Sequence, residues 1–207
     1  MSGNGKFLSI GWRYILPVWG GTLFVLVFSD ALLLNLLLIT MSFFTAYIFY
    51  VPERAPVESV QRAIISPIDG KVLSVSERGD GVSIVIKKSL FDGSSVVRAP
   101  MACKLDEQKV IHGLFLKESH HLSASLNENA KITWFIGNRE YLLKIKCGFY
   151  SLSLPLLFTG GKLEAGENLA LLTDGSAELL LPKSSTVEIK PGERVVGGYS
   201  LLAYGAE

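Results

Sequence analysis

A glycine-serine pair near the C-terminus, Gly175-Ser176 in LTDGSAELLLP, is the place where this chain could modify itself. A serine hydroxyl held against the carbonyl carbon of the preceding residue can attack it and convert the peptide bond into an ester. Elimination then cuts the chain and leaves dehydroalanine, which hydrolyses to a pyruvoyl group that reacts with amines. Turns use Gly-Ser freely, and a second pair stands at Gly93-Ser94, so the pair by itself favours a tight turn that enters a strand.

Histidines and cysteines offer little further chemistry. His112 lies in the strand-like KVIHGLF, and His120 and His121 are adjacent in KESHHL. Neighbouring histidines without a Cys, Asp or Glu partner at a useful spacing do not form a metal site, so no metal is predicted. Cys103 and Cys147 have neither zinc-type nor redox-motif spacing, and we expect two unpaired thiols.

The charge and composition limit the class of protein. The chain has 20 Lys and Arg against 19 Asp and Glu, so it has no basic field for a nucleic acid and none is predicted as a partner. Apolar residues make up 49% of the 207 residues, and their excess is concentrated at the N-terminal end. This length has room for one domain and an appendage.

The N-terminal appendage resembles a membrane anchor. Between Ile15 and Tyr50 the only Asp, Glu, Lys or Arg is Asp30. One straight helix of this length would reach about 54 Å against a hydrocarbon core of roughly 30 Å, so we expect two segments, 15–28 and 31–50. A helical hairpin, or one span with an interfacial helix, would fit. No small-residue cleavage site follows the first segment, which argues against a cleaved signal peptide; a buried, soluble helical hairpin is the other alternative.

These features divide the chain into membrane-anchor segments at 1–50, a linker at 51–63 and a β-rich domain at 64–207. Lys6 and Arg13 flank the apolar stretch on one side, and Arg54 and Arg62 on the other. A hairpin with two basic flanks predicts that the flanks, and the β-rich domain with them, face the cytoplasm at the cell membrane.

The remainder of the chain predicts a mainly β fold, a compact sandwich or barrel. Short alternating segments such as KVLSVSE and VSIVIKK lie between turn signals, and KITWFI and REYLLKIK flank Gly137-Asn138 as a hairpin. A helix is expected only around KESHHLSASLNEN. SPIDGKVLSV and KPGERVVGGYSLLA resemble the strand-turn signatures of barrel-sandwich hybrid domains, the lipoyl and biotinyl carriers, but the lysine that those carriers display is missing.

A series of motifs then runs along nearly the whole chain: GWRYI, two apolar segments, YVPER, SPIDGKV, VVRAP, HGLF, SASLNEN and GGKLEAGENLALLTDGSAELLLP. In this order they resemble the short bacterial and archaeal phosphatidylserine decarboxylases. The resemblance implies an N-terminal membrane anchor and self-cleavage between Gly175 and Ser176, with Ser176 becoming a pyruvoyl cofactor. It also implies decarboxylation of phosphatidylserine, or a related amino-phospholipid, to phosphatidylethanolamine.

The same resemblance suggests roles for three further residues. The family's SPxDG aspartate matches Asp69, which would orient a base or help to activate Ser176, as the third member of a triad does; the alternative is a plain Asp-Gly turn. Arg98 is the basic residue of VVRAP and is suited to a lipid phosphate, unless it is an ordinary arginine at a strand end. Asn127 is carried over as a second substrate-binding residue.

Four departures from the family pattern surround this site. Ser95 stands where the family has a histidine, and a serine cannot accept a proton near neutral pH as imidazole does. Asn129 replaces an arginine suited to phosphate or carboxylate. The run SLSLP replaces a basic pair. Asp174 replaces the hydrophobic residue before Gly-Ser, and its charge would not help an oxyanion to form.

Two functions therefore compete. The first is an active decarboxylase in which His120 and His121, close to where the family places substrate-side residues, act as a substitute acid and base; the alternative for that pair is a solvated loop. The second is a catalytically inactive relative that serves as a membrane-tethered lipid- or protein-binding module. A membrane-tethered barrel-sandwich adaptor is a third reading, which the lack of a coiled-coil hairpin disfavours. The sequence leaves open whether the chain forms a homo-oligomer.

Overall fold

The computed structural model describes residues 6–54, 62–79, 81–158 and 161–205. It is mainly β, with 41% strand and 22% helix, and a helical pair precedes the strands, so the predicted fold class is confirmed. The chain forms two compact units, residues 1–53 and 54–207. Residues 55–61 of the predicted linker lie outside the described residues.

The first unit is a pair of apolar helices, α1 (Trp12–Phe28) and α2 (Leu32–Phe49), which follow the short helix η1 (Ser9–Gly11). The strands β1 (Lys6–Phe7) and β2 (Tyr50–Val51) pair at their base. A hydroxyl pair, Thr22 Oγ1 and Ser42 Oγ at 2.8 Å, links the helices, while most of their leucines and phenylalanines are exposed. Ser9–Phe28 and Leu32–Phe49 are long and apolar enough to cross a membrane, which is weak evidence for membrane association.

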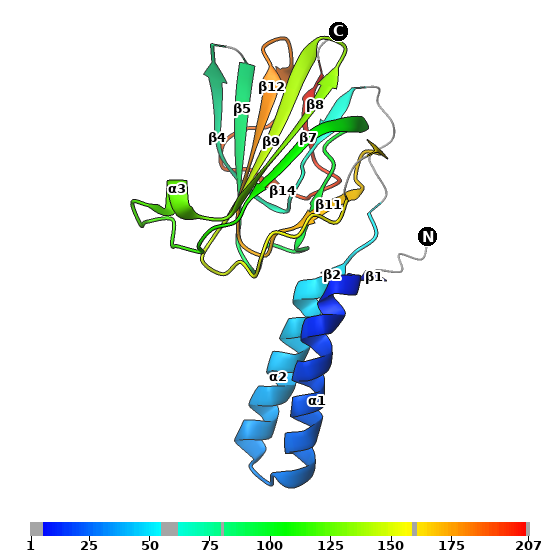
Figure 1. The fold of residues 1–207 in the computed structure, drawn as a ribbon, viewed down its shortest axis with the longest axis vertical. Helices are drawn as coiled ribbons and strands as arrows, with labels where there is room; N and C mark the ends of the chain where they lie inside the picture. The colour runs from blue at the N-terminus through cyan, green and yellow to red at the C-terminus, as the bar shows by residue number, and fades with distance from the viewer. Residues whose placement is uncertain (1–5, 55–61, 80, 159–160, 206–207) are drawn as a thin grey trace. The chain divides into compact units, whose positions relative to one another are not determined.

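The second unit is built on one long antiparallel sheet (Figure 1). Its strand order is β10-β7-β8-β9-β12-β5-β4-β14. The strands are β4 (Gly70–Arg78), β5 (Gly81–Lys88), β7 (Cys103–Ile111), β8 (Asn129–Ile136), β9 (Arg139–Cys147), β10 (Lys162–Leu163), β12 (Gly175–Pro182) and β14 (Arg194–Val195). The predicted hairpin around Gly137-Asn138 is confirmed, because Ile136 pairs with Arg139 across that turn.

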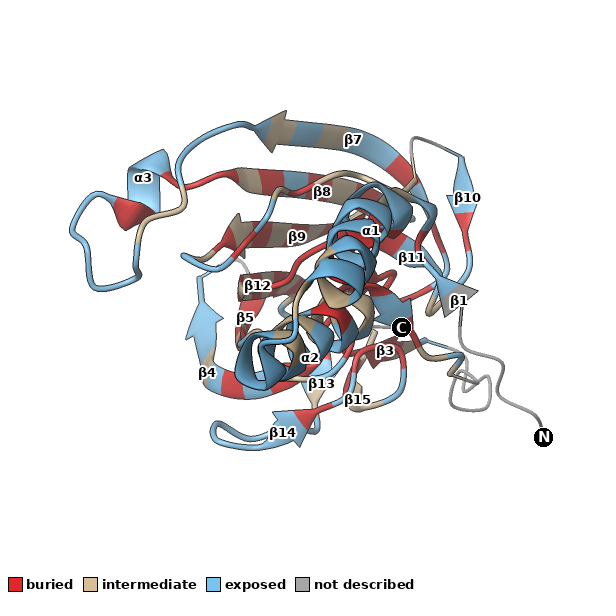
Figure 2. Ribbon diagram, turned by 90° about the horizontal axis from the view of Figure 1, so that it is seen from below, coloured by how far each residue is buried: buried red, intermediate tan, exposed pale blue. Residues whose placement is uncertain are grey.

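Shorter strands lie against the curved sheet, as the view from below shows (Figure 2). Two pairing groups join these strands: β6 (Val96–Arg98) with β11 (Asn168–Leu171), and β13 (Thr186–Val187) with β15 (Leu201–Tyr204) and β3 (Ala63–Ile65). Between these layers lies one apolar core, in which Ile84, Leu143 and Leu179 of the sheet pack in the same cluster as Ile64 and Leu202. Alternation of buried and half-buried residues along β12 and β9 supplies this core from one face of the sheet, and the other face carries lysines, Glu178 and Ser176 beside Leu142 and Leu180.

One short helix, α3 (Ser123–Leu126), interrupts the strands, within the only segment of the β-rich domain where the sequence predicts helix. It belongs to the connection between β7 and β8, which projects from the end of the sheet where β12 begins (Figure 1).

Candidate functional site

Ser176 is the second residue of β12 and lies between two lysines. Its Cα pairs with that of Lys87 in β5 on one side and that of Lys146 in β9 on the other. Directly paired residues of an antiparallel sheet direct their side chains to the same face, so the hydroxyl of Ser176 is flanked by two ammonium groups. Within the described residues no hydrogen bond engages this hydroxyl, and the side chain is half-buried.

Gly175 is required by its backbone. Its φ of +142° is one that L residues with a side chain rarely adopt, and a Cβ built there would lie 2.1 Å from the carbonyl oxygen of Lys146. Only glycine therefore fits at the start of β12 while the pairing with β9 is kept. The conformation at the predicted cleavage point thus depends on the residue type before the serine.

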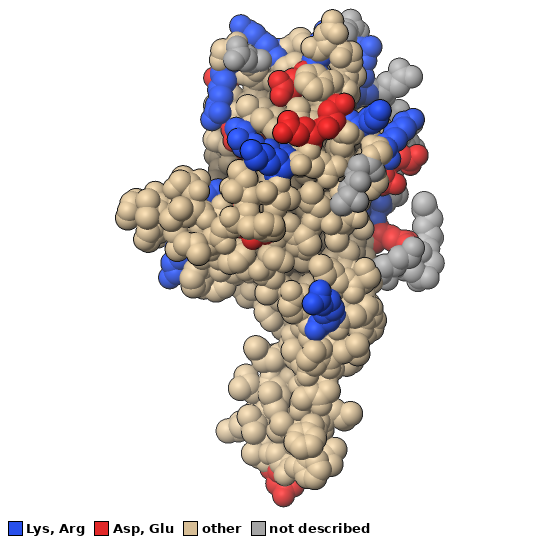
Figure 3. Space-filling view, in the orientation of Figure 1, with Lys and Arg blue, Asp and Glu red and all other residues tan. Residues whose placement is uncertain are grey.

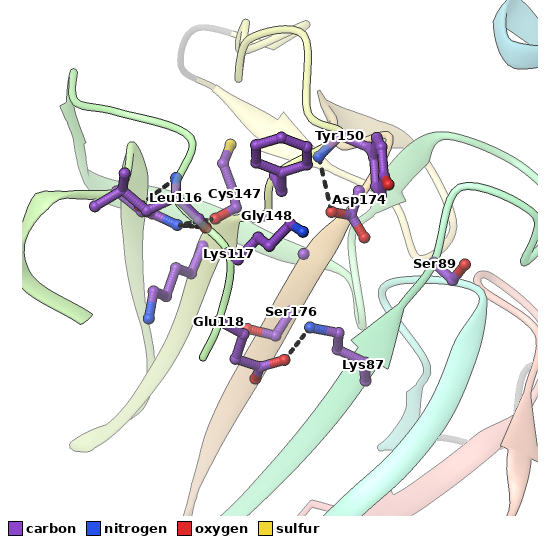
Figure 4. Close-up of a pocket in the computed structure, with 14 residues that line it drawn as sticks. Lys87, Ser89, Leu116, Lys117, Glu118, Cys147, Gly148, Tyr150, Asp174 and Ser176 are labelled. Carbon is purple, nitrogen blue, oxygen red and sulfur yellow. Dashed lines mark hydrogen bonds and ion pairs between the residues drawn. The ribbon is translucent and has the colours of Figure 1, made fainter. Parts of the chain in front are cut away.

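A pocket of about 310 Å³ opens over this pair (Figure 4). Its lining comes from β5, β9 and β12, from the connection that carries α3, and from the segment after β9. The charged residues in the lining are Lys87, Lys117, Glu118, Lys146 and Asp174. Lys87 forms an ion pair with Glu118, whereas the ammonium group of Lys146 makes no hydrogen bond or ion pair with the described residues.

Asp174 lines the same pocket two residues before Ser176. Its Oδ2 accepts a hydrogen bond of 3.1 Å from the backbone N–H of Tyr150, and its carbonyl oxygen accepts one of 2.9 Å from that of Gly148. These bonds fasten the segment after β9 to the start of β12, so the charge of Asp174 is held at the wall of the pocket.

Asp69, predicted to assist Ser176, is buried outside this pocket, and its carboxylate is fully engaged. Arg54 donates to both oxygens, at 2.5 Å to Oδ1 and 2.7 Å to Oδ2. The backbone N–H groups of Ser94 and Gly197 each donate a further bond of 2.6 Å. No hydrogen bond joins Asp69 to Ser176 among the described residues.

Comparison with known proteins identifies the family of this chain. A family model for phosphatidylserine decarboxylase matches residues 41–203, which is well over half of the chain. The chain belongs to this family.

Curated relatives agree with this assignment, and each is named phosphatidylserine decarboxylase proenzyme. The protein of Carboxydothermus hydrogenoformans is 31% identical over 82% of this chain and 83% of its own length. That of Solibacter usitatus is 28% identical over 96% of both chains, and that of Symbiobacterium thermophilum is 27% identical over 82% of both. No solved structure is significantly similar.

Ser95, which the family resemblance sets in the place of a histidine, is buried in the segment that contacts Asp69. The N–H of Ser94 binds the carboxylate, and the carbonyl oxygen of Ser95 accepts a 2.7 Å bond from Leu172. A Cβ at Gly93, whose φ is +73°, would lie 2.3 Å from Asp69 Oδ2. The segment 93–95 is thus closely packed against the aspartate, and it brings no imidazole there.

The two predicted substrate-binding residues occupy different places. Arg98 is buried in β6, away from the pocket lining, and its Nη1 donates a 2.9 Å bond to the carbonyl of Gly166. Burial, with the nearby charge of Arg54, lowers the pKa of Arg98. Asn127 does line the pocket, but its amide binds the backbone N–H and C=O of Leu116 and the C=O of Cys147. Asn127 therefore ties the connection that carries α3 to the end of β9.

The two candidate substitute bases lie on the projecting connection. The rings of His120 and His121 stack with their centroids 4.7 Å apart, and both residues are exposed. His120 Nδ1 accepts a 3.3 Å bond from the N–H of Leu122. Neither histidine lines the pocket around Ser176, although Lys117 and Glu118 of the same connection do.

Sequence analysis missed Lys88, which lies between the segment that contains Asp92 and the start of β12. It is the last residue of β5, pairs with Gly175, and is completely buried, with its Nζ donating a 3.0 Å bond to the carbonyl of Asp92. Burial lowers its pKa, against the opposing influence of Asp69, Asp92 and Asp174. The alternation of VSIVIKK could have predicted that Lys88 is buried, because Lys88 is in phase with the buried Ile84 and Ile86.

Proposed function

We propose that this protein is a pyruvoyl-dependent decarboxylase of an amino-phospholipid, phosphatidylserine in the first instance, and that it cuts itself between Gly175 and Ser176. The observation that carries the proposal is the position of Ser176. It follows an obligatory glycine, begins a central strand and lies on the floor of a pocket with Lys87 and Lys146 beside it.

Self-processing would use only this chain's own atoms. The Ser176 hydroxyl attacks the carbonyl carbon of Gly175, loses its proton to a base, and the amide nitrogen departs as an amine, giving an ester. Loss of the Ser176 Cα proton then expels the Gly175 carboxylate and leaves dehydroalanine, and hydrolysis of that residue releases ammonia. The ketone of the resulting pyruvoyl group condenses with a primary amine and accepts the electrons that decarboxylation releases.

The lysines suit the substrate of this reaction. A phosphatidylserine headgroup carries a phosphate and a carboxylate beside its amine, and Lys146 lines the pocket with an ammonium group that pairs with no acid among the described residues. Lys87 is already paired with Glu118, so Lys146 and Lys117 are the side chains we assign to the headgroup phosphate. Arg98 would then hold Gly166 and Asn127 would shape the pocket wall.

The same proposal implies that the protein is bound to the cell membrane. The two apolar helices would enter the bilayer as a hairpin and keep the β-rich unit at the cytoplasmic face of the cell membrane, where the substrate is found. A homo-oligomer is compatible with this arrangement.

The second candidate function is an inactive family member that binds lipid or protein. The observation that favours it is the saturated carboxylate of Asp69: Arg54 and two backbone N–H groups leave it no free capacity to orient a base. Ser95 and Asp174 point in the same direction, because neither supplies an imidazole to Ser176.

The intact mass of the protein purified from membranes, beside a Ser176→Ala variant, separates the two. Two chains divided after Gly175, the shorter one blocked to Edman degradation and with the mass of a pyruvoyl terminus, would establish the cofactor. Asp174→Asn, Glu118→Gln and a double His120→Gln, His121→Gln variant would then identify the group that accepts the proton. A single uncut chain of 22.6 kDa in both samples would eliminate the decarboxylase.

A further inference from the structure

Several large apolar side chains are exposed on the segments that form the rim of the Ser176 pocket. Two segments form it, the connection 112–127 and the segment 147–155 that follows β9. Phe149 and Tyr150 line the pocket, and the other exposed large apolar side chains of these two segments are those of Leu114, Leu122, Leu126 and Leu152. We call these six side chains together the collar. Tyr150 is 62% exposed and Phe149 48%, so two neighbouring aromatic side chains face outward at the pocket.

The collar is a built surface and not a loose pair of loops. The amide of Asn127 binds Leu116 of one segment and Cys147 of the other, at 2.9 Å in each case. The Leu114 N–H donates a 2.7 Å bond to the carbonyl of Leu126, which closes the connection on itself. The Phe149 and Tyr150 rings meet edge to face with centroids 5.0 Å apart.

The charges in and around the collar are positive on balance, three lysines of the pocket lining against Glu118 and Asp174, and an anionic lipid surface attracts that sign. Lys117 Nζ lies 5.4 Å from the centre of the Phe149 ring, and Lys146 faces the pocket. Residues 147–158, CGFYSLSLPLLF, contain no Asp or Glu. Glu118 is the single acid in the sequence of 112–127, and it lines the pocket. Over the projection that carries α3, the face seen in Figure 3 is almost entirely uncharged. Aromatic rings beside lysines are typical of groups that sit at the headgroup level of a membrane.

We infer that the collar inserts into the surface of an anionic phospholipid bilayer, so that the pocket opens directly onto the membrane. The inference deepens the proposed function and rests on it for the choice of occupant, because the pocket at the centre of the collar must stay open to a lipid. A protein partner covering the collar would close that opening. Insertion of the collar is separate from anchoring by the helices, since it concerns side chains of the β-rich unit alone.

Depth measurements on labelled side chains test the inference without any need for catalysis. Nitroxide labels are placed at Tyr150→Cys and at Leu122→Cys, in the full chain carrying Ser176→Ala, reconstituted in phosphatidylcholine and phosphatidylglycerol vesicles. The buried native thiols do not compete for the label, because burial raises the pKa of Cys103 to about 11 and that of Cys147 to about 12. Retention of the unlabelled protein's melting temperature verifies the fold of each variant.

The matched control is Phe135→Cys. Phe135 is 50% exposed and also aromatic, but it lies at the far end of the β8–β9 hairpin, about 20 Å along the strand from Asn129, which pairs with Lys146. We expect both collar labels to be relaxed several-fold more by oxygen than by a water-soluble nickel chelate, and the control to show the opposite preference.

The remaining outcomes contradict the inference. A collar label that matches the Phe135 control would place that part of the collar in water. Shielding from both quenchers, with cross-linking between two copies of the chain, would assign the collar to an interface between protomers. Failure of self-cleavage in the mass measurement would leave these readings intact, so the two proposals fail independently.

Discussion

Arg54 binds both carboxylate oxygens of Asp69, at 2.5 and 2.7 Å, with only 16% and 8% of the two side chains exposed. The arginine also donates to the carbonyl of Gly197, whose neighbouring N–H binds Asp69 in turn. A residue that directly follows the helical unit is thereby fixed to the turn that begins β4. The pair occupies the carboxylate that the family resemblance assigns to catalysis.

Removing one partner of this ion pair should destabilise the β-rich unit strongly. Arg54→Gln leaves a buried carboxylate without its counter-charge, which costs about 3–5 kcal/mol in comparable sites. For a domain of this size that corresponds to a melting temperature lower by about 10 °C. Differential scanning calorimetry in detergent measures it.

The double variant Arg54→Gln, Asp69→Asn provides the control for that pair. Because neither side chain then leaves an uncompensated charge, it should recover more than about 1 kcal/mol relative to the sum of the single variants. Additive losses would show that the two side chains act separately. The surface pair of Arg194 and Asp92, 3.7 Å apart with the arginine 84% exposed, should change the melting temperature little when Arg194 becomes Gln.

Gly175→Ala should block cleavage although Ser176 is kept. The Cβ would lie 2.1 Å from the carbonyl oxygen of Lys146 at a φ of +142°, so the start of β12 must shift and move the scissile carbonyl away from the hydroxyl. The intact mass should remain that of one chain, and the melting temperature should fall. Gly79→Ala is the matched control, since a Cβ there meets nothing within 4 Å and cleavage should proceed as in the wild type. Efficient cleavage of Gly175→Ala would contradict the conformational requirement.

The two native thiols should be nearly inert in the folded protein. Burial raises the pKa of Cys147 to about 12 and that of Cys103 to about 11, so at pH 8 the thiolate fraction is roughly a hundredfold or more below that of an exposed thiol. Reaction with a disulfide reagent should therefore be at least about a hundred times slower than after denaturation, when both thiols react. Rapid titration of Cys147 would mean that the end of β9 opens to solvent, and rapid titration of Cys103 would mean that the start of β7 does.

How far the sequence could predict this protein depends on whether the signal is local. The β8–β9 hairpin follows from two alternating segments around Gly137-Asn138, and the helical pair follows from an apolar stretch with one charge, Asp30. The order of motifs was enough to indicate the decarboxylase family, which the comparison confirms.

The composition of the site was less accessible, because sheet pairing creates it. Lys87 and Lys146 flank Ser176 only through the register of three strands that are far apart in the sequence. Arg54 was assigned to the basic flank of a membrane segment, and its bond to Asp69 requires the fold of the whole β-rich unit. Arg98 and Asn127 are polar residues in the expected motifs, but their hydrogen bonds are made with backbone groups that no sequence pattern specifies.

Lys88 provides the last prediction, because a completely buried lysine should make stability depend on pH. Its pKa is lowered in the folded protein from an ordinary value of 10.5, chiefly by burial. Between the lowered value and 10.5 the unfolded chain binds more protons than the folded one, so the free energy of unfolding rises with pH in that window. The raised thiol pKa values act in the opposite sense above about pH 9, where the unfolded thiols ionise first.

Lys88→Met isolates this contribution, since a variant with the same thiols differs from its parent only in the titrating amine. In the Ser176→Ala background, where the covalent state is fixed, we expect the variant to be more stable at pH 7, because burial disfavours the Lys88 ammonium more than its acidic neighbours favour it. That advantage should shrink as the pH approaches 10.5. There the amine of Lys88 becomes neutral in the unfolded chain as well as in the folded one, so folding no longer has to remove its proton or bury its charge. Lys87→Met, at the neighbouring position on the outer face and paired with Glu118, should show no such convergence. A constant difference across the pH range would mean that the packing of Lys88, and not its charge, determines its cost.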